Sequence, residues 1–105
     1  MPTYVLLDHF TDQGIRNVKD TLKRSQTFRQ LAKKHGATVR EVFWTQGQYD
    51  VVSIVEAPDD QVVAALSLSV ESAGNVRIQT LRAFTAEEME KILGRVNQRE
   101  SPAAD

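Results

Sequence analysis

The sequence contains no cysteine, which excludes disulfides, thiolate nucleophiles and metal sites built on cysteine. Its charges nearly cancel, with 13 lysines and arginines against 14 acids, so no overall field favours nucleic acid or an anionic membrane. No apolar run approaches the roughly 18 residues that a membrane-spanning helix needs, and the N-terminus lacks the basic segment of a signal peptide. We therefore expect a cytoplasmic protein.

Patterns that bind metals or nucleotides are also scarce. The two histidines lie far apart, and no helical pair or calcium-loop spacing of ligands occurs. Gly47 stands without the further glycines of a phosphate loop or a dinucleotide fingerprint. We predict neither a metal nor a cofactor.

The length and composition suit one small globular domain. Of the 105 residues, 41% are hydrophobic and 26% are charged, which allows a modest core that gains from a partner. We predict one domain over residues 1–97 and a flexible C-terminal tail over residues 98–105.

Strand and helix patterns alternate along the chain. Runs of β-branched and other apolar residues predict four strands, over residues 3–10, 38–44, 49–56 and 76–84. In the second strand, Val39, Glu41 and Phe43 are expected to alternate with Val42 and Trp44. Helical spacing predicts three helices, over residues 14–35, 58–73 and 86–96, and a second cap at Asp20 and Thr21 indicates a short turn of helix before the main part of the first one.

The expected helix ends carry capping residues. Thr11 is a candidate N-cap, and Gly36 suits the position after the last turn of the first helix. Pro58 is expected at the first position of the second helix. Thr85 and Glu88 form a capping box for the last helix.

The resulting order, β-α-β-β-α-β-α, is the ferredoxin-like pattern with an extra C-terminal helix, an α+β fold with a four-stranded antiparallel sheet. Both faces of this sheet are apolar, because Tyr4 and Leu6 point one way while Val5 and Leu7 point the other. Two helices cover one face only. The last helix can cover part of the other face, but a second copy covers it best, so we expect a homodimer in a barrel-like arrangement.

The segments "YVLLDHFTDQGIRNVKD", "VFWTQGQYDVVSIVEAPDD" and "GNVRIQTLRAFTAEEM" resemble the GYD-domain family over residues 3–96. The Gly-x-Tyr-Asp element of that family corresponds to Gly47, Gln48, Tyr49 and Asp50. The resemblance implies a dimeric α+β barrel. That group includes cofactor-free oxygenases, isomerases, haem proteins and ligand-sensing domains, so the fold alone does not choose between enzyme and sensor.

The cluster around the expected hairpin has two interpretations. In the structural one, Tyr49 and Trp44 pair across the hairpin and Asp50 accepts bonds from turn amides. In the functional one, Tyr49 and Asp50 stand at the mouth of a cleft, with Asp50 paired to Arg16 or Arg82, and orient a polar small molecule.

His9 is the candidate catalytic residue, because histidine is the usual general base near neutral pH and His9 ends an apolar strand. Asp8 is adjacent but lies on the opposite pleat, so it is not expected to orient His9. The alternative is a histidine that is hydrogen-bonded at a strand edge.

Four further polar residues interrupt apolar strands. Ser53 and Thr80 can line a cavity or form ordinary core hydrogen bonds. Arg77 and Arg82 are an odd number of residues apart and point to opposite faces. Either can form a structural ion pair, with Glu56 for example, and the other can bind a carboxylate.

RNA-recognition domains share the β-α-β-β-α-β order, and residues 14–40 carry eight lysines and arginines against one acid. Their third strand displays aromatic rings for base stacking, however, and here that strand reads "YDVVSIVE". The pattern therefore disfavours nucleic acid as a partner.

Three functions are carried forward. The preferred one is a homodimeric module that binds a small organic ligand between facing sheets, or serves an accessory metabolic task, with Trp44, Tyr49, Asp50, Ser53, Thr80 and Arg82 as the ligand-binding residues. The alternative is a cofactor-independent oxygenase or isomerase that uses His9 as base. The third is an RNA-binding or purely structural protein.

Overall fold

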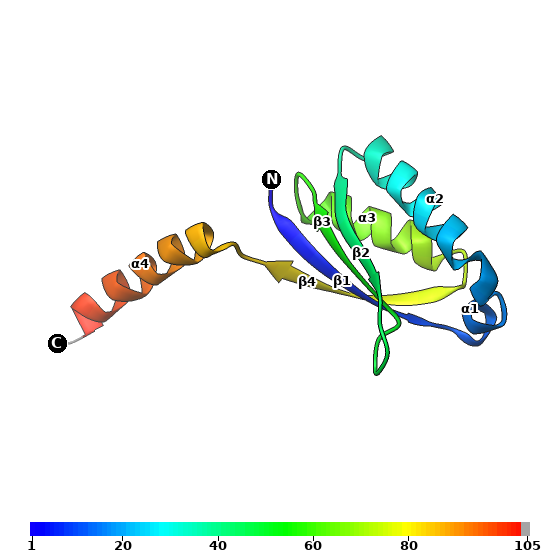
Figure 1. Ribbon diagram of the computed structural model, residues 1–105. Coiled ribbons are helices and arrows are strands. Elements are labelled where there is room, and N and C mark those ends of the chain that lie inside the picture. Colours follow the sequence, from blue (N-terminus) through cyan, green and yellow to red (C-terminus); the bar gives the residue numbers. More distant parts are fainter. Residues whose placement is uncertain (104–105) are drawn as a thin grey trace.

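The computed structural model describes the backbone of residues 1–103 and the side chains of residues 1–96 (Figure 1). In chain order its elements are β1 (Thr3–Phe10), α1 (Asp12–Arg16), the 3-10 helix η1 (Val18–Asp20), α2 (Thr21–Lys34), β2 (Thr38–Trp44), β3 (Val51–Glu56), α3 (Asp60–Glu71), β4 (Val76–Ala83) and α4 (Ala86–Ala103). The predicted order of elements is confirmed. No helix within this part of the chain is long and apolar enough to cross a membrane.

The four strands form one sheet in the order β2-β3-β1-β4, and every neighbouring pair is antiparallel. The α+β, ferredoxin-like prediction is therefore confirmed. One irregularity changes which residues share a face: the register of β2 shifts between Val39 and Glu41, which leaves Arg40 as an extra residue. The expected alternation is wrong at this point, because the bulge brings Val39 and Val42 to the same face.

The capping predictions are confirmed at two helices and corrected at a third. The Thr11 hydroxyl accepts a hydrogen bond from the Gly14 amide at 3.0 Å. Thr85 and Glu88 exchange the two bonds of a capping box, at 2.9 and 3.2 Å. Pro58 does not begin α3. The N-cap is Asp59, whose carboxylate accepts from the Val62 amide at 3.0 Å.

Helices α2 and α3 lie against the same face of the sheet (Figure 1). The core between them consists of buried apolar side chains from both layers, with few large residues among them. Its members are Tyr4, Leu6, Ala32, Ala37, Val39, Val55, Ala57, Val63 and Leu66. We call this side of the sheet the helix face.

The other side, which we call the open face, carries no helix in the described part of the chain. Directly paired residues of neighbouring strands share a face. The register therefore assigns to the open face an apolar set, namely Val5, Leu7, Phe43, Val52, Ile54 and Leu81. Phe43 and Leu81 remain 51% and 41% exposed. The second face thus carries the apolar set that the sequence predicted, beside polar residues such as Glu41 and Gln79 that the same register places on it.

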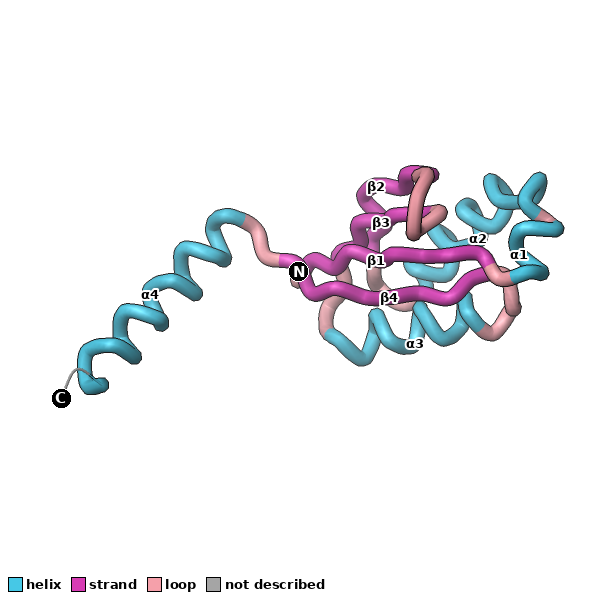
Figure 2. The backbone as a smooth tube through the Cα atoms, turned by 90° about the horizontal axis from the view of Figure 1, so that it is seen from below, coloured by secondary structure: helices cyan, strands magenta, loops and turns pink. Residues whose placement is uncertain are grey.

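The last helix does not cover this face, so that part of the prediction is wrong. Figures 1 and 2 both show α4 extending away from the sheet, beyond the end of β4. The molecule is consequently elongated, at 60 × 30 × 20 Å. Met89, Leu93 and Val96 on α4 are all exposed. The apolar side of this amphipathic helix is uncovered, and a partner can bury it.

Candidate functional site

The loop between β2 and β3 is a closed turn that Asp50 fastens to β1. The Thr45 amide donates to the Asp50 carbonyl at 2.9 Å, and Gly47 adopts a φ of +120° that favours glycine. The Asp50 amide donates to the Asp8 carbonyl, and its carboxylate accepts from the Phe10 amide, both at 2.8 Å. Asp50 lies immediately before β3, which begins at Val51.

Asp50 was predicted to pair with an arginine, Arg16 or Arg82, or with turn amides. Its carboxylate instead accepts a hydrogen bond from a backbone amide of β1, that of Phe10. The physical reason is that β3 pairs with β1 only as far as Asp8, so the Phe10 amide has no strand partner on that side. This contact accounts for Asp50 as a structural residue of the hairpin.

Tyr49 and His9 lie together at the edge of the open face. The Tyr49 hydroxyl donates to the Gln79 side-chain oxygen at 2.5 Å, and the rings of Tyr49 and His9 are 6.3 Å apart. His9 is exposed, and its direct neighbour on β4 is Arg77. Two of the predicted groups are thus brought together on the face where a second sheet was expected.

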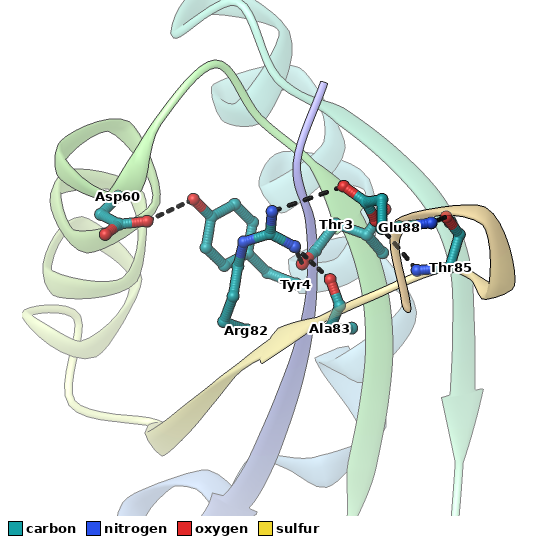
Figure 3. Close-up of polar contacts among 7 residues, drawn as sticks. All are labelled: Thr3, Tyr4, Asp60, Arg82, Ala83, Thr85 and Glu88. Carbon is teal, nitrogen blue, oxygen red and sulfur yellow. Dashed lines mark hydrogen bonds and ion pairs between the residues drawn. The ribbon is translucent and has the colours of Figure 1, made fainter. Parts of the chain in front are cut away.

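Arg82 on β4 lies at the opposite end of the sheet from His9. Its direct neighbour there is Tyr4 on β1 (Figure 3). Its guanidinium donates to the carbonyls of Thr3 and Ala83 and lies 3.5 Å from the Glu88 carboxylate. It also stacks 4.5 Å from the centre of the Phe84 ring. These contacts join the end of β4 to the first turn of α4.

Arg82 is therefore far from the predicted catalytic group, and the structure does not bring it together with His9 and Tyr49 within one chain. Arg77 and Arg82 do point to opposite faces, as predicted. Each forms an ion pair with an acid that was not expected. Arg77 pairs with Glu71 at 3.4 Å, and Arg82 pairs with Glu88 at 3.5 Å.

The remaining predicted residues lie on the helix face. Ser53 is buried and faces Leu6 across the β1–β3 pair, whereas Thr80 is exposed at the edge strand β4. Trp44, at the end of β2, donates from its indole Nε1 to the Thr21 hydroxyl at 3.0 Å. Trp44 therefore connects β2 to the start of α2 and does not pair with Tyr49 as the structural interpretation proposed.

Trp44 and Ser53 border a cavity of about 250 Å³ between the sheet and α2, which we call the helix-side cavity. Its walls are mostly apolar, with Phe10 from β1 and Phe28 from α2 among them. Several small polar and basic side chains of α2 complete the lining: Thr21, Lys23, Arg24, Ser25 and Thr27. None of the other predicted ligand residues borders it.

Asp8 is the acidic side chain of this cavity. Its Oδ1 is fully buried and has no hydrogen-bond partner among the residues that the structure describes. Burial, and then the nearby Glu71 carboxylate, raise the pKa of Asp8 to about 7. Asp8 therefore changes charge near neutral pH.

Sequence reasoning considered Asp8 only as a neighbour of His9 and missed it as a site residue. The signal was present in the strand. Asp8 has the same strand parity as Tyr4 and Leu6, both of which point into the core. The sequence therefore indicates a carboxyl group on the core side of β1, where an apolar side chain is usual.

No group of three histidine or acidic side chains within the described residues is close enough to hold a metal ion. The polar groups of the helix-side cavity are hydroxyls, one carboxyl, the Asn75 amide, the Trp44 indole and two basic side chains. This set suits hydrogen bonding to an organic molecule better than ligation of a metal.

Two comparisons with known proteins agree on a family. The model of the GYD domain matches residues 4–93. A protein of Thermus thermophilus named "Glutamine synthetase and cystathionine beta-lyase binding protein" is 34% identical over 85 residues, which cover 80% of this chain and 90% of that protein. The Gly-x-Tyr-Asp element thus lies in the hairpin that Asp50 fastens to β1, and the chain belongs to the GYD-domain family.

Proposed function

We propose that this protein is a homodimeric accessory module that binds an enzyme of metabolism and has no catalytic role of its own. The observation that carries the proposal is the open face. Its apolar strip crosses all four strands, with Phe43 on β2, Val52 on β3, Val5 on β1 and Leu81 on β4. A continuous apolar surface of this kind marks an interaction site.

A second copy of the chain is the occupant that the open face suits best. The register places residues of both signs at the margins of this face, Glu41 on one edge strand and Arg77 on the other, although the Arg77 guanidinium also pairs with Glu71 of α3. A two-fold axis presents the same patch on both copies, so a surface with both signs can be complementary to itself.

The projecting helix supports the same assembly. The contacts of Arg82 with Glu88 and Phe84 hold the first turn of α4 at the end of β4. They therefore fix the position at which the helix starts relative to the sheet. Its exposed stripe of Met89 and Leu93 has no covering element among the described residues. If α4 packs against a second copy of the chain, this stripe is buried and the interface becomes larger.

The accessory role is supported by the relative from Thermus thermophilus, whose name states that it binds glutamine synthetase and cystathionine beta-lyase. At 34% identity over most of both chains, a related binding role is the simplest proposal for this protein. A cytoplasmic location is part of the proposal.

The enzyme alternative stays a prediction. His9 and Tyr49 share the edge of the open face, where a second sheet would enclose them, but Arg82 is bound to backbone carbonyls and Glu88 at the other end of the same sheet. The group that was expected to orient a substrate is therefore occupied within the chain, which favours the accessory role.

A pair of variants tests the dimer. Leu81→Glu places a carboxylate in the open face, and Leu68→Glu makes the same change at a leucine of α3 that is 66% exposed outside that face. In sedimentation velocity at low micromolar concentration, we expect Leu81→Glu to convert a two-chain species to single chains and Leu68→Glu to leave it intact. A wild-type single chain, or equal behaviour of both variants, would contradict the dimer.

The accessory role has a separate test. Purified glutamine synthetase and cystathionine beta-lyase from the same organism as the chain are immobilised, with an unrelated enzyme as control, and binding of the wild-type protein is followed by interferometry. We expect saturable binding to at least one of the two. Absence of binding to both overturns the enzyme-binding part of the proposal and leaves the dimer to be judged by sedimentation.

A further inference from the structure

The helix-side cavity has the composition of a small-molecule site. Its volume of about 250 Å³ is bounded by three aromatic rings, Phe10, Phe28 and Trp44. Pockets for organic ligands are mostly apolar and contain a few polar groups that fix orientation. Here these groups include the Ser53 hydroxyl and the Asp8 carboxyl, together with the Asn75 amide and the hydroxyl and basic side chains of α2.

Asp8 is the least satisfied group of the cavity. Its Oδ1 is buried without a hydrogen-bond partner in the described part of the chain. Leaving a buried acceptor unpaired costs on the order of 1–3 kcal/mol, so a native protein is expected to use such a group. Tyr4 and Leu6, its neighbours on the same face of β1, show that an apolar side chain fits this row.

The charged groups around Asp8 do not neutralise it. On α3, Glu71 is also acidic and accepts from the Ile78 amide. On α2, Arg24 donates to the backbone carbonyls of Asn17 and Gly14, at 2.8 and 3.5 Å. Residues 51 and 78, which flank Asp8 on β3 and β4, are uncharged.

Two further charged residues lie near this group. The Asp50 carboxylate, next to β1, is bonded to the Phe10 amide. Lys23, which also borders the cavity, is exposed. Among the described residues no ion pair involves Asp8. The Asp8 carboxyl therefore has no ion-pair partner among the described residues, in a cavity lined by aromatic side chains together with Lys23 and Arg24.

We propose that the helix-side cavity binds a small organic amine, whose ammonium group donates to Asp8 and whose apolar body lies among Phe10, Phe28 and Trp44. A cation in this position gains the charge-assisted hydrogen bond to the carboxylate and attraction to the rings of Phe28 and Trp44, whereas the Phe10 ring already has the Arg24 guanidinium 5.8 Å from its centre. A carboxylate ligand would be repelled by the ionised Asp8 and would depend on Lys23 and Arg24 instead. The site lies on the helix face, so it is independent of the proposed dimer through the open face.

The binding has a predictable dependence on pH. Burial and Glu71 raise the pKa of Asp8 to about 7, so the carboxylate that the ammonium requires becomes more abundant as the pH rises through this value. Affinity for the amine should therefore increase from about pH 5.5 to about pH 8, by roughly tenfold or more. A ligand held by apolar contact alone would show no such change.

The test uses benzylamine as the probe, with benzyl alcohol and benzoate as ring-matched neutral and anionic controls. Binding is measured from amide shifts in two-dimensional NMR spectra of the full chain. We expect saturable shifts at Phe10, Phe28 and Trp44 with benzylamine, and binding at least roughly tenfold weaker with either control. We expect Asp8→Asn, which keeps the shape of the side chain, to weaken benzylamine by roughly 30-fold or more.

Three results would overturn the inference: no saturable shift with benzylamine at millimolar concentration, equal binding of benzyl alcohol or benzoate, or equal affinity in Asp8→Asn. If that variant does not fold, the pH dependence in the wild-type protein decides instead, and a flat profile overturns it. Sedimentation of the same samples reports the dimer, so failure of the amine site is distinguishable from failure of the proposed function.

Discussion

Replacing Asp8 by asparagine should stabilise the protein at alkaline pH and have almost no effect at acidic pH. The reason is that burial, followed by the Glu71 charge, raises the pKa of Asp8 from an ordinary value of 3.8 to about 7 in the folded chain. Between these two values the folded protein binds more protons than the unfolded one. The free energy of unfolding of the wild type therefore falls as the pH rises through this window.

The size of the effect follows from the same two values. At about 1.4 kcal/mol for each pH unit, the interval from 3.8 to about 7 corresponds to at most roughly 4 kcal/mol, and water that enters the cavity reduces it. Asparagine does not titrate. The stability difference between Asp8→Asn and wild type should thus grow from near zero at about pH 4 to a few kcal/mol at about pH 8.

Urea unfolding of both proteins across this pH range measures the difference directly. Protein concentration is held constant, because assembly changes apparent stability. Asp20→Asn, at an exposed position, serves as the control for the loss of one negative charge. Parallel stability curves for Asp8→Asn and wild type would refute the reasoning, since they would mean that Asp8 is ionised alike in both states.

Three further substitutions have defined outcomes. Gly14→Ala should destabilise the fold by about 1–3 kcal/mol in urea unfolding, because the added Cβ would stand 1.9 Å from the Asn75 carbonyl oxygen. Tyr4→Phe should cost about 1 kcal/mol, since it removes the 2.5 Å bond from the phenol to the exposed Asp60 carboxylate and leaves that group hydrated. Arg82→Ala should speed amide exchange in the first turn of α4 by roughly two- to fivefold, because the exposed ion pair that holds it is lost.

Two of these predictions have matched controls. Gly94→Ala lies in α4 with open space around it, so it should not destabilise, and a loss as large as that of Gly14→Ala would mean that the close approach is not the cause. Arg95→Ala removes an exposed arginine from the same helix and should leave exchange in the first turn unchanged. An unaltered unfolding midpoint for Tyr4→Phe would argue that the phenol bond contributes nothing net.

Local patterns were sufficient for the order of elements and for most helix ends. The Thr11 cap and the Thr85–Glu88 capping box depend on side chains within three residues of each other, so the sequence contains all that is needed. The opposite directions of Arg77 and Arg82 likewise follow from strand parity alone.

Features that depend on distant contacts could not be predicted in the same way. The bulge at Arg40 shifts the parity of β2, and no pattern in residues 38–44 indicates this bulge. The periodicity of α4 indicates an apolar side but not its direction, which the contacts of Arg82 with Glu88 and Phe84 determine. The partner of Asp50 depends on where β3 stops pairing with β1.

The most direct test of the account is the mass of the native assembly at low micromolar concentration. Native mass spectrometry of the wild-type protein should give a species of two chains, because the proposed dimer buries the exposed Phe43 and Leu81 of the open face. The detection of stable single chains under these conditions would contradict the central claim.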